Sequence, residues 1–378
     1  MENVVTDGEV AVSPPKQRDA LFDVAKGIGI LLVLGHHSFS NSARLYSTSH
    51  SWLWWGLNLA NRILSFSVPV FLLISAVLSA RGLIKNPAVG PFYRKRFPAI
   101  LWPYLVWTGI YWIARMVIDP KSRLIVPGSI FGIPVNGPAM FVHVKERLLD
   151  VFWGKAFFHM YFMVVLFEIL LLLPLAVAYV KWRKPGFWEV LVTAFALQGV
   201  VMVVQHYTAF MPFPGSNAFW YLGSLLPGAW IGANWELFKE QCKRYVWPLS
   251  VFILITGGLF LREEWHVIHH IEADNYLSNG SLTIYASCLA VLVLVLSMKI
   301  TLKPGQGRLL ESLGKNSLQI YLMHPAIMQM LERPRIVSLI KLTHLGPILS
   351  PAIMLAIVFG LIRLLRVTHT EKLLFGRG

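Results

Sequence analysis

Long runs of apolar residues recur along the whole chain and are separated by polar or basic connections. A helix needs roughly 20 mostly apolar residues to cross the hydrocarbon core of a bilayer. Runs of about that length predict ten membrane-spanning helices, at 21–38, 61–80, 99–118, 157–180, 187–205, 218–235, 246–261, 281–299, 316–331 and 347–365. The seventh and ninth of these runs are short. The pattern therefore predicts an all-α integral membrane protein.

The polar segments at the two ends of the sequence suggest the domain boundaries. We expect residues 1–20 to form a polar cytoplasmic tail, 21–366 a single transmembrane domain and 367–378 a second cytoplasmic tail. The first of these segments contains prolines, and it is too long and too acidic for the positively charged start of a signal peptide. The first helix is therefore expected to be an uncleaved anchor. No internal repeat is visible between the halves of the sequence.

The positions of lysine and arginine predict the orientation of the helices. Basic residues accumulate in the short cytoplasmic loops of membrane proteins. With the N-terminus placed inside, 22 of the 34 Lys and Arg residues fall on the inner side. The sequence therefore predicts that both termini are cytoplasmic, and that the connections 119–156 and 262–280 face the outside.

Composition narrows the class of protein further. Only 14% of the residues are charged and 56% are hydrophobic, whereas a soluble domain carries roughly 25% charged residues. The net charge of +15 reflects the basic inner loops, so we expect contact with membrane lipids and none with nucleic acid. Two cysteines cannot form a disulfide framework, and we expect neither Cys242 nor Cys288 to be bridged.

The first apolar run is bordered by ionisable residues, which are costly at membrane depth and usually functional. In "FDVAKGIGILLVLGHHSF", Asp23 and Lys26 stand at its start, and His36 and His37 stand at its end. Lys26 and His37 are eleven residues apart, which places them within about 20° of one helix face and about 16 Å apart along the axis. His36 points about 80° away from that face. Asp23 is close enough on the helix surface to pair with Lys26.

Two interpretations of these residues are open. In the first, Lys26 extends its amine to the inner membrane surface and the histidines lie at the outer interface. In the second, His37 is a general base in a partly dry channel, and Lys26 guides an anionic ligand that enters from the cytoplasm. Imidazole suits this second role because its pKa lies near neutrality.

This spacing, a Lys or Arg followed after ten residues by His, resembles the opening signature of the membrane-bound acyltransferase-3 family. The wording "DVAKGIGILLVLGHH" is closest to the sugar O-acetyltransferase branch, which includes fucose O-acetylase-like and xanthan-type enzymes. Four further segments resemble the family in order, "FSVPVFLLISAVLSARG", "YRKRFPAILWPYLVW", "HMYFMVVLFEILLLLPL" and "LGKNSLQIYLMHP". Ala76, Ala99 and Tyr161 depart from the more usual Gly, Arg and Trp.

The resemblance implies an enzyme that moves an acetyl group from cytoplasmic acetyl-CoA to a hydroxyl of a sugar, in an exopolysaccharide or its lipid-linked precursor. It implies catalytic roles for His37, Lys26 and Asp23. The residues expected to bind substrate are His36, Arg94, Lys95, Arg96, Ser317, Tyr321 and His324. Acetyl-CoA is expected as donor substrate, with no permanently bound cofactor and no metal. We expect a bacterial cytoplasmic (inner) membrane, with other polysaccharide-assembly proteins as further partners.

Structural interpretations stand beside these roles. Basic residues at 94–96 also hold an inner loop inside the cell, and the i, i+4, i+7 spacing of Ser317, Tyr321 and His324 also suits helix packing. Glu168, in mid-span, is expected to be protonated, paired with a polar neighbour or facing a water-filled cavity. His159 could be a second proton-handling group, but a satisfied interfacial histidine is the favoured interpretation.

The outer segment 262–280 contains several histidines and acids, but no HExxH pattern. We expect this cluster to be solvated, or to meet the glycan, and not to bind metal.

Two rival functions remain. Ten helices with intramembrane charges also fit a polytopic transporter of glycans or small molecules, although the paired halves with broken helices typical of transporters are not visible. A non-enzymatic subunit of a polysaccharide-assembly machine would need no ordered acyltransferase-like segments. A hydrolase with a nucleophile elbow is disfavoured because the sequence contains no GxSxG.

Overall fold

The computed structural model describes residues 20–45, 52–118, 129–130, 133–134, 148–301, 305–331 and 346–376. The helices are α1 (Ala20–Leu45), α2 (Trp52–Ile63), α3 (Ser67–Lys85), α4 (Val89–Ile118), α6 (Tyr161–Arg183), α7 (Phe187–Thr208), α8 (Leu222–Ala233), α9 (Trp235–Ile268), α10 (Asn275–Thr301), α11 (Arg308–Lys315), α12 (Ser317–Leu331), α14 (Gly346–Val367) and α15 (Glu371–Phe375). Three 3-10 turns are η1 (Leu64–Phe66), η2 (Pro214–Ser216) and η3 (Ala218–Tyr221). Two short antiparallel strands pair with each other, β1 (Ser129–Ile130) and β2 (Ile133–Pro134).

Within the described residues, eight helical segments are long and apolar enough to cross a membrane. They are Ala20–Arg44, Trp52–Lys85, Val89–Ala114, Tyr161–Arg183, Phe187–Thr208, Trp235–Ile268, Asn275–Thr301 and Leu349–Val367. The predicted all-α integral membrane architecture is confirmed. The predicted number of about ten spans is higher than the eight found by length and composition.

The difference arises at two predicted spans, 218–235 and 316–331. They correspond to α8 with 12 residues and α12 with 15 residues, both shorter than a bilayer crossing. In α8, 11 of the 12 residues are buried, so its apolar sequence reflects contact with protein on all sides. An apolar run alone does not distinguish such a core helix from a lipid-facing one. The short seventh run, 246–261, is instead the middle of the 34-residue helix α9.

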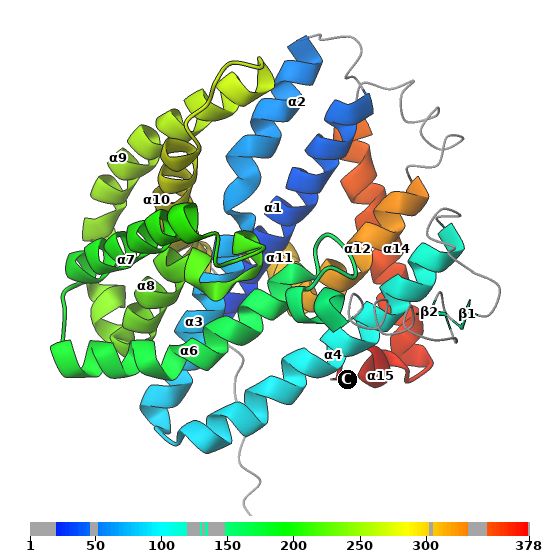
Figure 1. Cartoon of the computed structure of the whole chain (residues 1–378). Coiled ribbons are helices and arrows are strands. Elements are labelled where there is room, and N and C mark those ends of the chain that lie inside the picture. The colour runs from blue at the N-terminus through cyan, green and yellow to red at the C-terminus, as the bar shows by residue number, and fades with distance from the viewer. Residues whose placement is uncertain are drawn as a thin grey trace, which may run out of the picture.

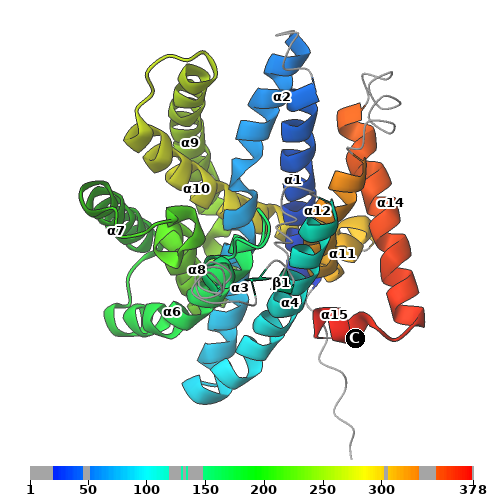
Figure 2. The same cartoon turned by 45° about the vertical axis from the view of Figure 1, so that its right-hand side comes forward.

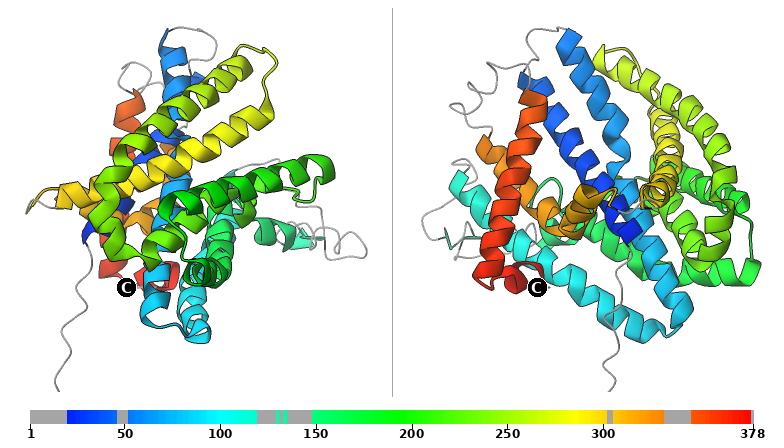
Figure 3. Two further views of the ribbon diagram at one scale, coloured as in Figure 1. Left: turned by 90° about the vertical axis from the view of Figure 1, so that its left-hand side faces the viewer. Right: turned by 180° about the vertical axis from the view of Figure 1, so that it is seen from behind.

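The helices surround a rod formed by α2, η1 and α3. This rod runs along most of the molecule with α1 beside it (Figures 1 and 2). The α9–α10 pair lies on one side of the rod and α12 with α14 on the other, as the view from behind also shows (Figure 3). Helix α4 begins at the end of α3 and crosses towards α15.

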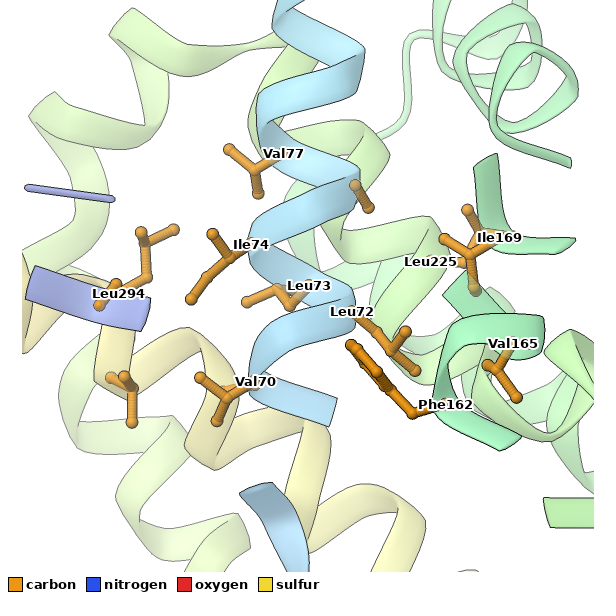
Figure 4. Close-up of a cluster of buried hydrophobic side chains, with 14 of the residues drawn as sticks. Val70, Leu72, Leu73, Ile74, Val77, Phe162, Val165, Ile169, Leu225 and Leu294 are labelled. Atoms are coloured by element: carbon orange, nitrogen blue, oxygen red, sulfur yellow. The ribbon is translucent and has the colours of Figure 1, made fainter. Parts of the chain in front are cut away.

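The centre of the core is α3, which is enclosed by protein. Its residues 70, 72, 73, 74 and 77 are at most 1% exposed. Figure 4 shows these side chains pointing in several directions around the helix, and its labels are Val70, Leu72, Leu73, Ile74, Val77, Phe162, Val165, Ile169, Leu225 and Leu294. A helix that is apolar on every face is expected to be buried on every face. Helix α3 therefore provides a rigid support for the neighbouring elements.

The two ends of the molecule differ in charge. The α3–α4 turn and α15 lie at one end, whereas the start of α2 and the α9–α10 connection lie at the other (Figures 1 and 2). The first end carries Arg81, Lys85, Arg94, Lys95 and Arg96 around the turn. This arrangement is consistent with the predicted inner location of that end, and the orientation in a membrane stays a prediction.

The segment after α14 is packed against the helical domain. The indole N–H of Trp102 donates to the backbone oxygen of Leu373 at 2.7 Å, and that of Trp107 donates to Leu374 at 3.1 Å. Phe375 is 1% exposed. Helix α15 is thus fastened to α4.

The same segment is tied to α12 by polar contacts. Arg366 donates to the side-chain oxygen of Asn316 at 2.8 Å and pairs with Glu371 at 3.2 Å. Glu371 also accepts a hydrogen bond from Gln319 at 3.2 Å. The first turn of α12 is therefore held through both α14 and α15.

Candidate active site

Helix α1 is positioned by a close backbone contact with α11. A Cβ atom added at Gly27 would lie 1.9 Å from the backbone oxygen of Leu310, and one added at Gly314 would lie 1.7 Å from that of Asp23. Both distances are far below a van der Waals contact. Only glycine fits at these two positions, and the contact fixes the first half of α1.

The predicted ion pair on α1 is present. Lys26 Nζ lies 2.7 Å from Asp23 Oδ1, and the side chain of Asp23 is 2% exposed against 22% for Lys26. A partly buried pair of this kind holds both charges in place but adds little to stability on its own account. Asp23 therefore restricts where the Lys26 amine can reach.

A cavity of about 300 Å³ lies beside the second half of α1. It is bordered by α1, η1, the start of α3, the segment before α6, the turns before α8, and α10. The lining residues are Val33, His36, His37, Ser65, Ser67, Val68, Pro69, Phe158, His159, Tyr161, Gly215, Trp220, Tyr221, Gly223, Ser224, Asn279, Leu282, Thr283, Ala286, Ser287 and Tyr321. One wall carries imidazoles, and the α10 side carries hydroxyl and amide groups.

Four imidazole rings form a chain at this wall. The ring centroids of His36 and His37 are 5.1 Å apart, those of His37 and His324 are 5.3 Å apart and nearly parallel, and those of His324 and His159 are 5.5 Å apart. His324 is fully buried behind the lining. Residues from three distant parts of the sequence therefore meet at one point.

Hydrogen bonds fix the orientation of two of these rings. His324 Nδ1 lies 2.7 Å from the backbone oxygen of Tyr321, and because a carbonyl only accepts, this nitrogen carries the proton. His36 Nδ1 lies 3.0 Å from the backbone oxygen of Asn61, whose side-chain amide donates back to the oxygen of His36 at 2.7 Å. The Tyr321 hydroxyl donates to the backbone oxygen of His159.

A protein-family comparison can be set against this geometry. A family model described as an acyltransferase domain matches residues 19–366. The chain belongs to the acyltransferase-3 family. Comparison with curated proteins and with solved structures gives no match. The matched range contains every residue of the cavity lining, seven of the candidate spans and all but the last residue of the eighth, so the protein is a membrane acyltransferase.

The structure brings some of the predicted site residues of this acyltransferase together. His36, His37 and Tyr321 line the cavity, and His324 stacks on His37. His36 is not turned away as the helical rotation predicted, because α2 approaches α1 at Asn61 and the cavity extends around that side.

Other predicted site residues lie elsewhere. Within the described part of the chain, Asp23, Lys26 and Ser317 lie outside the cavity lining, as do the basic residues of α4. Arg94 and Lys95 are exposed and Arg96 is half-buried. The continuous groove expected between Lys26 and His37 is thus not part of this cavity, which adjoins only the second half of α1.

The interpretation of His159 as a satisfied interfacial histidine is wrong. His159 is 2% exposed, and neither of its ring nitrogens has a hydrogen-bond partner among the described residues. Burial lowers the pKa of His159 well below its usual value, and nearby His324 and His37 lower it further. Sequence spacing could not reveal this residue, because the irregular segment before α6 delivers it to the cavity.

Two further polar features are resolved by the structure. Glu168 accepts a hydrogen bond from the backbone N–H of Ala218 at 2.6 Å. The turn before α8 is therefore the polar partner that could not be identified from the sequence. In the segment 262–280, Glu263 is 2% exposed and accepts a hydrogen bond from the backbone N–H of Asp274 at 2.8 Å. This acid supports the α9–α10 connection instead of being solvated. No group of three or more metal-binding side chains is found within the described ranges.

Proposed function

We propose that this acyltransferase transfers an acetyl group from acetyl-CoA to a hydroxyl of a sugar, in an exopolysaccharide or its lipid-linked precursor. The single observation that carries the proposal is the position of His37, which lines the cavity together with several hydroxyl and amide side chains. A general base has to lie within hydrogen-bond reach of the proton it removes. An acceptor hydroxyl bound among these lining residues would lie next to the imidazole, which supports the assignment of His37 as the base.

The acceptor wall supports a polyhydroxylated ligand. Ser224, Asn279, Thr283 and Ser287 offer donors and acceptors along one side of the cavity, and Trp220 offers an aromatic face. Small-molecule sites typically combine an apolar body with a few polar groups in a volume of about 300–1,000 Å³. A volume of about 300 Å³ suits a small part of a glycan, not a long segment of polymer.

The donor is proposed to approach from the basic end of the molecule. Coenzyme A carries phosphate groups, which Arg and Lys bind through charge-assisted hydrogen bonds. Arg94 and Lys95 are exposed near the α3–α4 turn. We assign the phosphates to Arg94, Lys95 and Arg96, and the thioester to the neighbourhood of His37.

The chemistry then follows an acyl transfer without a metal or bound cofactor. His37 removes the proton from the sugar hydroxyl while its oxygen attacks the thioester carbonyl carbon. The resulting oxyanion collapses, the carbon–sulfur bond breaks, and the thiolate leaves with the electron pair. It takes the proton from the His37 imidazolium, so the products are the O-acetyl sugar and coenzyme A. We further propose a bacterial inner-membrane location with other polysaccharide-assembly proteins nearby.

The test is acetyl transfer from radiolabelled acetyl-CoA to membrane glycolipid by the purified protein. We expect His37→Ala to lose about 10²–10⁴-fold in rate, as for removal of a general base. The matched control is His206→Ala, because His206 is an exposed residue of α7 outside the cavity lining. Normal transfer by His37→Ala would refute the assignment of His37 as the general base. A wild-type protein that moves glycan across vesicle membranes without using acetyl-CoA would refute the proposed acetyltransferase activity.

A further inference from the structure

The His159 side chain is enclosed by aromatic rings and also borders the cavity. Its ring centroid lies 5.0 Å from that of Tyr111, 5.2 Å from that of Tyr321 and 5.5 Å from that of Phe158. A buried polar group without a partner costs about 1–3 kcal/mol, and such groups in folded proteins call for an explanation. A ligand in the cavity would supply the missing partner.

Several polar groups near His37 are already engaged by the protein. His324 directs an N–H to a backbone oxygen, and the hydroxyl of Tyr321 donates to the backbone of His159. His36 Nδ1 lies within hydrogen-bond distance of the backbone oxygen and of the side-chain amide of Asn61. Tyr221 donates to the backbone oxygen of Gly215 at 3.0 Å. Within the described part of the chain, by contrast, no protein group pairs with either ring nitrogen of His159.

We propose that His159 is a second catalytic residue of the acetyl transfer, whose ring N–H donates a hydrogen bond to the carbonyl oxygen of the acetyl group. This inference rests on the proposed function. When the sugar oxygen attacks, the carbonyl π electrons move onto that oxygen, and the N–H stabilises the negative charge formed there. The bond strengthens as charge develops, so it lowers the barrier more than it tightens donor binding.

The surroundings of His159 favour this role over proton transfer. Burial and the neighbouring imidazoles lower the pKa of His159 well below its usual value, which favours the neutral ring, and a neutral imidazole has one N–H donor. The dry aromatic enclosure strengthens a hydrogen bond to an oxyanion because little water competes for it. In this assignment the two histidines have separate tasks: His159 donates a hydrogen bond to the carbonyl oxygen, and His37 accepts the hydroxyl proton.

The first test separates catalysis from folding. In His159→Phe the aromatic shape is kept and the N–H is removed; His159→Gln and His159→Asn each keep an amide N–H. We expect His159→Phe to lower kcat about 10²–10³-fold, the usual effect of losing one such donor, with little change in the KM for acetyl-CoA. At least one of the two amide variants should recover tenfold or more of this loss. His206→Phe is the matched His-to-Phe control.

Thermal unfolding distinguishes a structural role. Because both ring nitrogens are unpartnered, His159→Phe should melt at or above the wild-type temperature. A variant that melts several degrees lower and loses donor affinity together with kcat would overturn the inference in favour of a packing role. A kcat within threefold of wild type would also overturn it, while leaving the proposed function intact.

A second test is independent of turnover. Acetyl-CoA labelled with ¹³C at the thioester carbonyl is bound to the His37→Ala protein, in which transfer is blocked, and the infrared carbonyl stretch is recorded. We expect a shift to lower frequency that disappears in the His37→Ala, His159→Phe double variant. Equal frequencies in the two proteins would refute the hydrogen bond. Absence of any transfer by the wild type, with the shift still present, would refute the proposed reaction alone.

Discussion

The contact between α1 and α11 gives the sharpest prediction of stability. In Gly314→Ala the new Cβ would lie 1.7 Å from the backbone oxygen of Asp23 and 2.5 Å from its carbonyl carbon. Non-bonded heavy atoms need about 3.5 Å, so the two helices must separate by roughly 1.5–2 Å. Overpacking costs about 1–3 kcal/mol, and we expect the upper end because a backbone atom cannot rotate away.

The matched control is Gly258→Ala in α9, where an added Cβ meets no atom within 4 Å. Alanine in place of a mid-helix glycine favours the helix by about 0.5–1 kcal/mol. The two substitutions thus add the same methyl group to helical glycines with opposite expected signs.

The measurement is thermal unfolding of purified protein in detergent, followed with a thiol-reactive fluorogenic dye. Cys242 and Cys288 are both free and buried, so the dye reacts as the structure opens. We expect Gly314→Ala to melt about 6 °C below wild type, from about 3 kcal/mol at roughly 2 °C per kcal/mol. Gly258→Ala should melt at or above wild type. Equal melting temperatures for the two variants would refute the close approach of α1 and α11.

Two further predictions concern buried polar groups. Asp23→Asn removes the charge partner of Lys26, and we expect a loss of about 1–3 kcal/mol in the free energy of unfolding and reduced transfer activity; an unchanged melting temperature and rate would exclude a role for the pair. The lowered pKa of His159 means that the unfolded chain binds a proton below about pH 6.5 that the folded protein does not. Stability should therefore fall as the pH drops from 7 to 5, and His159→Phe should reduce this slope, whereas identical slopes would contradict a buried neutral ring.

Regular helices explain which parts of the site could be predicted from the sequence. Asp23 and Lys26 are one turn apart on α1, and their pairing follows from helix geometry alone. Tyr321 and His324 share α12, and both reach the wall that contains His37. In each case, a short and regular element carries the residues, so their spacing determines their relative positions.

Tertiary packing explains what could not be predicted. His159 arrives on an irregular segment in which Gly154 has a φ of +66°, and no periodicity describes its path. The turn that supplies Ala218 to Glu168 is equally local and irregular. The apolar sequence of α8 could not reveal whether lipid or protein covers it, because both environments select the same side chains.

The contacts of α15 extend the support of the candidate active site far along the sequence. Gln319 lies on α12 only five residues before His324, and it is held by Glu371, which also anchors Arg366. Trp102 and Trp107 of α4 donate hydrogen bonds to backbone oxygens of the same helix, α15. A reporter or purification tag joined directly to α15 would disturb the contacts through which this helix connects α4, α12 and α14. Investigators who compare differently tagged preparations should therefore include a spacer, since altered turnover could originate at the tag.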